Sequence, residues 1–360
     1  MKKRVLSFLT AAVMTTAMIL SGCSGSQTAA TTAAPAATET KAETTAAAKT
    51  EAATTKAAPA EKKEIVVGFS QVGAESDWRT ANTESMKSTF TEANGYKLIF
   101  DDAQQKQENQ LKAVRNFIQQ DVDYIVIAPV TETGWDTVLQ EAKDAGIPVI
   151  IVDRMINVSD DSLYTAWVGS NFLQEGYDAV AWLDEYLKKN NRADDDINIV
   201  TLQGTIGSSA QIGRTNGVEE KMKDHPKWKM LERQTGEFTQ AKGQEVMESF
   251  LKTYNDIDVV IAENDNMAFG AIDAIKAAGK TCGPKGDIII ISFDAVSAAF
   301  DSMIAGDMNV SVECNPLHGP RVAEIIQKLE KGEKVDKIAY VKEGVFPADT
   351  AAAEKPKRQY

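Results

Sequence analysis

The segment Ile147-Pro148-Val149-Ile150-Ile151-Val152-Asp153-Arg154 decides how we interpret the fold. A continuous apolar run of this length is typical of a strand that is buried on both faces, as in a parallel sheet. In open α/β sheets, ligands bind at the carboxyl ends of the strands. Asp153 and Arg154 stand at that end and offer acceptors and donors that suit a polyhydroxylated ligand. The alternative is an ordinary salt-bridged loop.

Similar apolar runs recur along the chain, and segments with helical spacing separate them. One such segment carries Leu111, Val114, Phe117 and Ile118 on one face. Strands that alternate with helices predict right-handed crossovers and a parallel sheet. The predicted strands are 65–69, 96–100, 124–128, 149–152, 197–202, 230–234, 259–262 and 288–293, with predicted helices at 212–222, 242–254 and 267–278. The α/β pattern occurs twice, which predicts two lobes that face each other across a cleft. A later strand (310–313) and helix (321–331) fit either lobe.

The amino-terminal region predicts export. Residues 1–22 combine a basic start with an apolar run that is too short for a membrane-spanning helix, as in a secretory signal peptide. Leu20-Ser21-Gly22-Cys23 resembles a bacterial lipobox, so we expect lipid attachment at Cys23; a plain secretory signal is the alternative. Residues 23–63 are mostly Ala, Thr, Lys, Glu and Pro, and we interpret them as a disordered tether.

Composition limits the classes of partner and cofactor. Loss of Lys2, Lys3 and Arg4 with the signal peptide would take the formal charge from −13 to −16. Such an acidic body argues against nucleic acid, whose phosphates require a basic surface. Beyond Cys23 only Cys282 and Cys314 occur, and their spacing indicates neither a disulfide framework nor a zinc site. We therefore expect no metal and no cofactor.

The common catalytic motifs are missing from the sequence. His225 and His318 lie far in sequence from any candidate nucleophile, and we interpret them as surface or capping residues. The loop 204–209 has glycines that would suit a phosphate at a helix start, but no lysine follows it. A plain turn between strand and helix is the preferred interpretation.

Polar and aromatic side chains follow most of the predicted strands, in both lobes. Singly, each is ordinary, because Asp and Asn often cap helices, and capping is the ordinary interpretation of Asp265. Together they are suited to a sugar, whose C–H faces pack on aromatic rings and whose hydroxyls pair with carboxylate, amide and guanidinium groups. The candidate site residues are Gln71, Glu75, Trp78, Arg79, Asp153, Arg154, Arg214, Phe238, Asn264, Asp294 and Glu313.

From about Glu64 to its end, the chain resembles the type I periplasmic sugar-binding proteins of bacterial ABC importers, most closely their galactofuranose-binding branch. The segments that carry the resemblance are VGFSQVG (67–73), ESDWR (75–79), QQKQENQ (104–110), KAVR (112–115), APV (128–130), TGW (133–135), DR (153–154), LQGT (202–205) and GQEVMESF (243–250). The resemblance covers most of the body of the chain.

The resemblance implies two Rossmann-like lobes joined by three crossing segments near Val168, Glu313 and Val341. The first lobe would comprise 64–168 plus 314–341, and the second 169–313 plus 342–360. The family's ligand contacts carry over to Trp78, Asp153, Arg154, Arg214, Phe238, Asn264, Asp294 and Glu313. The corner formed by Gln71, Glu75 and Arg79 matches the galactofuranose branch. Ribose-binding members have two adjacent aromatic residues where this chain has Asp77-Trp78, which makes ribose itself doubtful.

These observations predict a lipoprotein on the outer face of the cytoplasmic membrane, or in the periplasm, that captures a monosaccharide. We expect a monomer that delivers galactofuranose or a related aldose to ABC permease subunits and that is not an enzyme. A sugar-sensing module that presents its closed surface to a membrane receptor remains an alternative. Lactose-repressor-type regulators have the same fold but carry an amino-terminal helix-turn-helix. This chain has a predicted signal peptide in that place, which excludes a DNA-binding regulator. A glycosidase would need two carboxylates that flank a bond, for which Asp153 and Asp294 are the candidates.

Overall fold

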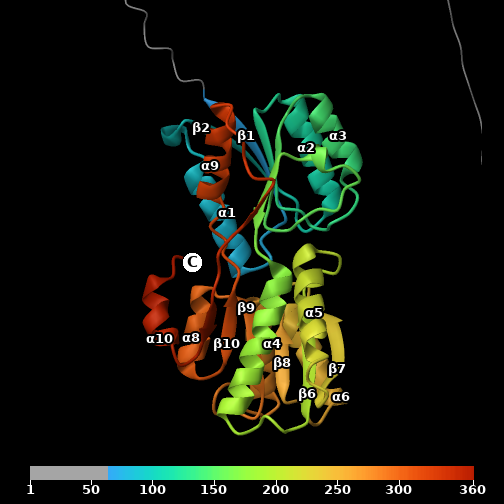
Figure 1. Cartoon of the computed structure of the whole chain (residues 1–360), viewed down its shortest axis with the longest axis vertical. Coiled ribbons are helices and arrows are strands. Elements are labelled where there is room, and N and C mark those ends of the chain that lie inside the picture. The colour runs from blue at the N-terminus through green and yellow to red at the C-terminus, as the bar shows by residue number, and fades with distance from the viewer. Residues whose placement is uncertain (1–63) are drawn as a thin grey trace, which may run out of the picture. The chain divides into compact units, whose positions relative to one another are not determined.

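The computed structural model describes residues 64–360. The predicted signal peptide (1–22), tether (23–63) and lipidated Cys23 lie outside the described residues. Within this part of the chain, the strands form two six-stranded sheets, each flanked by helices (Figure 1). This arrangement confirms the predicted α/β fold of two Rossmann-like lobes.

The first sheet has the strand order β11-β5-β4-β3-β1-β2, and all its pairings are parallel. Its strands are β1 (Ile65–Gln71), β2 (Tyr96–Asp102), β3 (Tyr124–Ile127), β4 (Val149–Val152), β5 (Ala166–Gly169) and β11 (Ile338–Tyr340). The order reverses at β1, which lies between β3 and β2. Such a switch point opens a crevice at the carboxyl ends of the strands, where doubly wound proteins bind ligands.

The second sheet repeats this plan in the order β12-β10-β9-β8-β6-β7, where only β12 runs antiparallel to its neighbour. Its strands are β6 (Ile197–Gln203), β7 (Trp228–Thr235), β8 (Val259–Ala262), β9 (Ile289–Asp294), β10 (Val310–Glu313) and β12 (Val345–Pro347). The corresponding reversal is at β6. A register shift between Ile199 and Val200 interrupts its pairing with β7.

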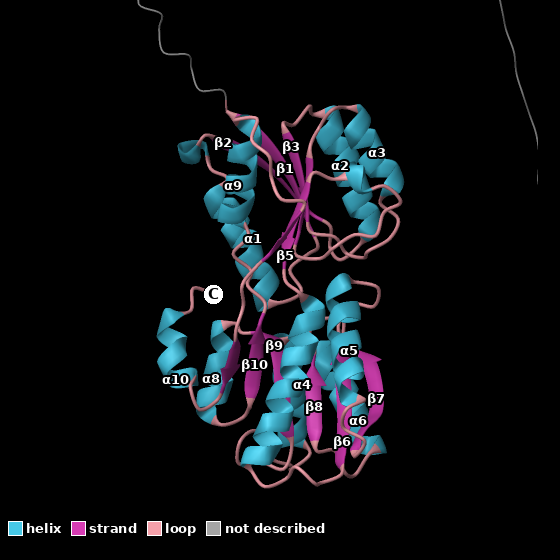
Figure 2. Ribbon diagram, viewed as in Figure 1, coloured by secondary structure: helices cyan, strands magenta, loops and turns pink. Residues whose placement is uncertain are grey.

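Helices cover both faces of each sheet (Figure 2). In the first lobe they are α1 (Asp77–Thr89), α2 (Gln107–Gln119), α3 (Asp136–Asp144) and α9 (Gly319–Glu330). In the second lobe they are α4 (Phe172–Lys189), α5 (Ser209–Met222), α6 (Gln240–Thr253), α7 (Asp265–Ala277), α8 (Ser297–Ala305) and α10 (Ala351–Glu354). Single turns of 3-10 helix are η1 (Glu92–Asn94), η2 (Asp161–Leu163) and η3 (Lys355–Lys357).

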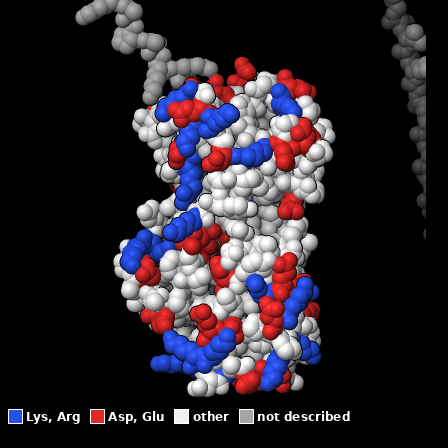
Figure 3. Space-filling model, in the orientation of Figure 1, with Lys and Arg blue, Asp and Glu red and all other residues white. Residues whose placement is uncertain are grey.

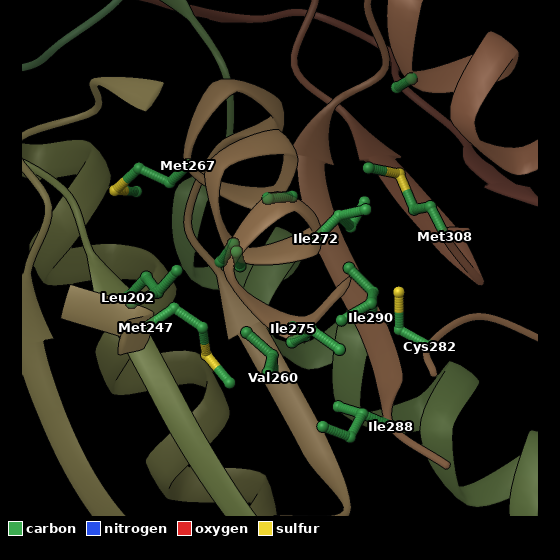
Figure 4. Close-up of a cluster of buried hydrophobic side chains, with 14 of the residues drawn as sticks. Leu202, Met247, Val260, Met267, Ile272, Ile275, Cys282, Ile288, Ile290 and Met308 are labelled. Carbon is green, nitrogen blue, oxygen red and sulfur yellow. The ribbon is translucent and has the colours of Figure 1, made fainter. Parts of the chain in front are cut away.

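Each sheet separates two hydrophobic clusters, because successive side chains of a strand point to opposite faces. In β3, Val126 joins one cluster while Ile125 and Ile127 join the other. Figure 4 shows the cluster between the second sheet and helices α6 and α7, where Leu202, Val260 and Ile290 meet the helices. Both faces of the sheets are therefore buried, which explains the continuous apolar runs in the sequence.

The chain crosses between the lobes three times. The first crossing joins β5 to α4, the second joins β10 to α9, and the third joins β11 to β12. Helix α9 packs on α1, where the backbone N–H of Gly319 donates to Ser85 Oγ at 3.0 Å. The late strand β10 pairs with β9 in the second sheet. The sequence pattern alone left open which lobe these two elements join. In the structure, β10 belongs to the second lobe and α9 packs on the first.

Most predicted elements are confirmed. Strands predicted at 149–152, 259–262 and 310–313 have the same bounds as β4, β8 and β10. The prediction omitted β5 and the 18-residue helix α4 that follows it. None of the helices in residues 64–360 is long and apolar enough to cross a membrane. Acidic and basic side chains are interspersed over the face shown in Figure 3.

Candidate functional site

A cavity lies between the carboxyl ends of the two sets of strands. Nine of the eleven predicted site residues line it: Glu75, Trp78, Arg79, Asp153, Arg154, Arg214, Phe238, Asn264 and Asp294. Ser76, Phe172, Ala210 and Cys314 complete the lining. The residues come from both lobes and are buried or nearly so. A ligand held here would contact both lobes at once.

The first lobe contributes a buried network of four charges. Arg79 lies between two carboxylates, with its Nη2 2.7 Å from Asp153 Oδ2 and its Nε 3.0 Å from Glu75 Oε1. Arg154 Nη2 lies 3.6 Å from the same oxygen of Glu75. Two acids and two guanidinium groups thus balance one another at almost completely buried positions. Glu75 Oε2 and Arg154 Nε have no hydrogen-bond partner.

The pKa values of Asp153, Arg79 and Arg154 each correspond to a charged side chain at neutral pH. Burial alone would raise the pKa of Asp153, but the charges of Arg79 and Arg154 outweigh burial and lower it. Burial alone would lower the pKa of Arg79, but Asp153 and Glu75 raise it above its ordinary value. Burial and the nearby charge of Arg79 lower the pKa of Arg154 to about 10, so it stays charged at neutral pH.

Gln71 lies behind this network and does not line the cavity. Its Oε1 accepts a hydrogen bond from Arg79 Nη1 at 3.2 Å, and its Nε2 donates to Asn82 Oδ1 at 2.8 Å. Asn82 in turn donates to the carbonyl oxygen of Pro316 at 2.8 Å. The Gln71 amide therefore fixes the direction of the Arg79 side chain.

The second lobe presents one arginine and two acids. Arg214, on α5, donates from Nε to Glu175 Oε2 at 2.6 Å, and its Nη2 lies 3.4 Å from Asp294 Oδ1. Its Nη1 donates to the carbonyl oxygen of Glu263. Burial raises the pKa of Asp294 well above its ordinary value and also raises that of Glu175. Arg214 thus lies within ion-pair distance of both acids.

Aromatic rings line the cavity from both lobes. Trp78, on α1, lies within the core cluster of the second lobe, and its Nε1 donates to the Cys314 carbonyl oxygen at 2.6 Å. The guanidinium of Arg154 lies 5.2 Å from the centre of the Phe238 ring, and that of Arg214 lies 5.4 Å from the Phe172 ring. These contacts hold the rings and the cations in fixed positions beside the cavity.

Phe238 depends on two neighbours for its position. Asn264 caps α7 by accepting from Met267 N at 2.9 Å, and its Nδ2 donates to the Phe238 carbonyl oxygen at 3.0 Å. A Cβ atom at Gly204 would lie 1.9 Å from the tip of the Phe238 ring. Glycine at this position therefore makes room for the ring. Asp265, which the sequence suggested as a cap, is instead buried and accepts from Ser292 Oγ at 2.5 Å.

Several site residues have a left-handed backbone. The φ angles are 61° at Asp153, 60° at Phe238 and 110° at Asp294. Such angles are uncommon outside glycine and are unfavourable for a bulky residue such as phenylalanine. They occur where strands or loops turn at the cavity, a clustering that is typical of ligand sites.

Glu313 lies at the end of β10, outside the cavity lining. Its Oε1 accepts from Arg358 Nη2 at 2.8 Å and from Tyr360 Oη at 2.9 Å, and its Oε2 accepts from Gly344 N at 3.0 Å. It thereby joins the second and third crossings to the carboxyl-terminal residues. In the loop 204–209, Ser208 caps α5 and accepts from Gln211 N at 3.3 Å.

Sequence reasoning missed four lining residues. Phe172 directly follows the first crossing and Cys314 begins the second, and the predicted hinge positions near Val168 and Glu313 were the available signals. Ser76 is the N-cap of α1 and accepts from Arg79 N at 3.1 Å. Ala210 has no side-chain chemistry that a sequence pattern would reveal.

Hydrogen bonds also join the lobes directly around the cavity. They run from Asp77 N to Asn266 Oδ1 (3.0 Å), from Met155 N to Ser209 Oγ (2.8 Å) and from Glu132 N to Gly207 O (3.0 Å). Each pairs a residue of the first lobe with one of the second. The described structure is therefore closed around the cavity.

Comparison with known proteins agrees with this geometry. The family model described as "Periplasmic binding protein domain" matches residues 67–334. The chain is 44% identical over 299 residues to the galactofuranose-binding protein YtfQ of Escherichia coli (strain K12), covering 82% of this chain and 92% of that protein.

Two solved structures are similar over the same region. One is a protein from Mycobacterium smegmatis in complex with β-D-fucofuranose, with 45% identity, a TM-score of 0.78, and coverage of 82% of this chain and 95% of that one. The other is the binding protein of an arabinose ABC transporter from Shewanella sp. ANA-3, bound to L-arabinofuranose, with 47% identity, a TM-score of 0.77 and the same coverage. These matches confirm the resemblance recognised in the sequence: the chain belongs to the periplasmic binding protein domain family.

Proposed function

We propose that this protein binds a monosaccharide in its furanose ring form and delivers it to the permease of an ABC importer. The observation that carries the proposal is the closed cavity in which Glu75 Oε2 and Arg154 Nε lack hydrogen-bond partners. Buried polar atoms are nearly always paired, so these two atoms are suited to the hydroxyl groups of a ligand. The relatives described above, which bind furanoses according to their names or titles, support the ring form.

The lining residues divide into three proposed roles. Trp78 and Phe238 would pack on the C–H faces of the sugar. Asp153, Arg154, Arg214, Asn264 and Asp294, together with Glu75 and Arg79, would pair with its hydroxyls. Gln71 and Glu313 would act indirectly, Gln71 by orienting Arg79 and Glu313 by bracing the crossings. A furanose hexose has an exocyclic glycol arm, and the corner at Glu75 and Arg79 has polar groups suited to hold it.

Capture would proceed by closure of the lobes. We place the first lobe at 64–168 plus 314–341 and the second at 169–313 plus 342–360, so that the three crossings act as a hinge. A ligand that contacts both lobes binds the closed state more tightly and therefore shifts the equilibrium toward it. The closed surface would then be presented to the permease.

Family membership implies an extracytoplasmic location. We propose in addition that Cys23 carries a lipid anchor, that the protein acts as a monomer, and that it binds its sugar without turnover. The basis for the anchor is the lipobox-like Leu20-Ser21-Gly22-Cys23. Replacement of Cys23 by alanine should release the protein from the membrane fraction, whereas unchanged fractionation would refute the anchor.

A thermal-shift screen tests the proposed ligand class. Methyl galactofuranoside and L-arabinose should raise the melting temperature, while methyl galactopyranoside, which cannot open to a furanose, should not. Recovery of intact methyl galactofuranoside after prolonged incubation is expected for a binding protein. Stabilisation by the galactopyranoside alone, or hydrolysis of the furanoside, would contradict the proposal.

A further inference from the structure

The three crossings meet in a cluster of polar side chains behind the cavity. Ser170 follows β5, Cys314 and Asn315 follow β10, and Glu343 precedes β12. Glu343 Oε1 accepts from Ser170 Oγ at 2.6 Å and from Asn315 N at 2.6 Å. Ser170 Oγ also lies 3.2 Å from Cys314 Sγ. One carboxylate therefore links all three crossings.

Three potential metal-binding atoms converge in this cluster. A carboxylate oxygen of Glu175, the Sγ atom of Cys314 and a carboxylate oxygen of Glu343 all lie within 4.8 Å of one another. Glu175 is in the first turn of α4, directly after the first crossing. One ligand thus comes from the helix that follows the first crossing and one from each of the other two crossings, and their wide separation in sequence explains why no metal-ligand spacing is visible there.

Glu175 provides an independent indication of a missing ligand. The residue is only 3% exposed, and its Oε2 is occupied by Arg214 Nε at 2.6 Å. Its other oxygen, Oε1, has no hydrogen-bond partner. A buried carboxylate oxygen that is left unpaired is unfavourable, and a cation bound beside it would satisfy it.

The donor set specifies the class of cation. One thiolate with two carboxylates suits a borderline-soft divalent ion, because Zn²⁺ accepts both sulfur and oxygen while Ca²⁺ and Mg²⁺ prefer oxygen alone. In a tetrahedral zinc site the donor atoms lie about 3.5 Å apart, so small side-chain movements would bring these three into position. Water or the Ser170 hydroxyl would supply the fourth ligand.

We propose that Glu175, Cys314 and Glu343 form a zinc-binding site that ties the three crossings together. Zinc bound there would restrict changes in the angle between the lobes. Because Cys314 also lines the cavity, zinc would further alter the rate at which sugar exchanges; this consequence alone rests on the proposed function.

Metal titration of the full chain, treated with a chelator and kept free of sugar, tests the site. Calorimetry should give one bound Zn²⁺ per chain, and Co²⁺ should produce a thiolate-to-cobalt charge-transfer band. Cys314→Ser should abolish the band. Both Cys314→Ser and Glu343→Gln should lower the affinity for Zn²⁺ at least about tenfold, as expected for the loss of a ligand. Cys282→Ser is the matched control, because this second buried cysteine lies outside the cluster and the substitution should change neither result.

Absence of stoichiometric Zn²⁺ binding would overturn the site, as would a cobalt band that survives in Cys314→Ser or disappears in Cys282→Ser. Glu343→Gln retains the thiol and provides a second reading if Cys314→Ser folds poorly. Sugar titrations are run separately with chelator present. Absence of sugar binding in these titrations would refute the proposed function but not the metal site. Absence of metal binding, with sugar binding retained, would refute the metal site but not the proposed function.

Discussion

Arg79 Nη2 lies 2.7 Å from Asp153 Oδ2, and both side chains are almost completely buried. Asp153 stands at the end of β4, while Arg79 is in the first turn of α1. The pair thus connects two elements at the carboxyl edge of the first sheet. Its position beside the cavity links the stability of the first lobe to its capacity to bind a ligand.

Arg79→Ala should both destabilise the protein and abolish tight sugar binding. Removal of Arg79 breaks the two shortest ion pairs of the network and leaves Asp153 and Glu75 buried with only longer contacts to Arg154, which costs about 3–5 kcal/mol. Denaturant unfolding measures the loss of stability. Arg115→Ala is the matched control, because Arg115 pairs with Glu141 at an exposed position and its loss should cost less than about 1 kcal/mol. Equal effects of the two substitutions would contradict the role given to Arg79.

Gly204→Ala should displace the Phe238 ring and weaken sugar binding. The new Cβ would lie 1.9 Å from the ring, so the ring must move. We expect a loss of about 1–3 kcal/mol in stability from the crowding. In a Phe238→Ala background the same glycine substitution should have little further effect, because the obstacle is gone. A double-mutant cycle measures this coupling, and additive effects would show that the contact is unimportant.

Glu263 should contribute a loss of stability to the sugar-free protein as the pH rises from about 4.5 to about 7. Burial raises the pKa of Glu263 from an ordinary 4.5 to about 7. Between these values the folded protein binds more protons than the unfolded chain, so its stability decreases with rising pH. A difference of this size corresponds to roughly 3 kcal/mol. Glu263→Gln should flatten the dependence of melting temperature on pH in this range; an unchanged slope would exclude Glu263 as the cause.

Sugar should shift the protein toward the closed arrangement described here. The hydrogen bonds between the lobes, such as Met155 N to Ser209 Oγ, can form only when the lobes approach. A sugar that contacts both lobes binds this closed arrangement more tightly than an open one and therefore increases its population. Solution scattering should therefore give a smaller radius of gyration at saturating sugar. An identical radius with and without sugar would refute ligand-driven closure.

The sequence predicted the parts of the fold that depend on regular patterns. β4 was recognised because both faces of a parallel strand are buried and its residues are continuously apolar. Helix α4 was missed, although Asn171 caps it and lysines occupy its last turn. The strand β5, which precedes α4, was also missed, because its four residues are too few to show a clear apolar pattern.

Within the candidate site, residues at strand ends could be predicted and those set by tertiary structure could not. Asp153 and Asp294 end apolar runs, so their place at the edge of a sheet follows from the pattern. Cys314 lines the cavity only because the second crossing bends past Trp78. The positions of Gln71 and Glu313 behind the lining depend likewise on partners distant in sequence, such as Arg358.

Calorimetry with methyl galactofuranoside and methyl galactopyranoside tests the central claim most directly. The parent protein should bind the furanoside with micromolar affinity or better, near −8 kcal/mol, and should not measurably bind the pyranoside. Asp153→Asn should lower the affinity for the furanoside by roughly 30- to 1,000-fold, because the substitution removes a charged acceptor from a desolvated site. Tighter binding of the pyranoside, or undiminished binding by Asp153→Asn, would contradict the account.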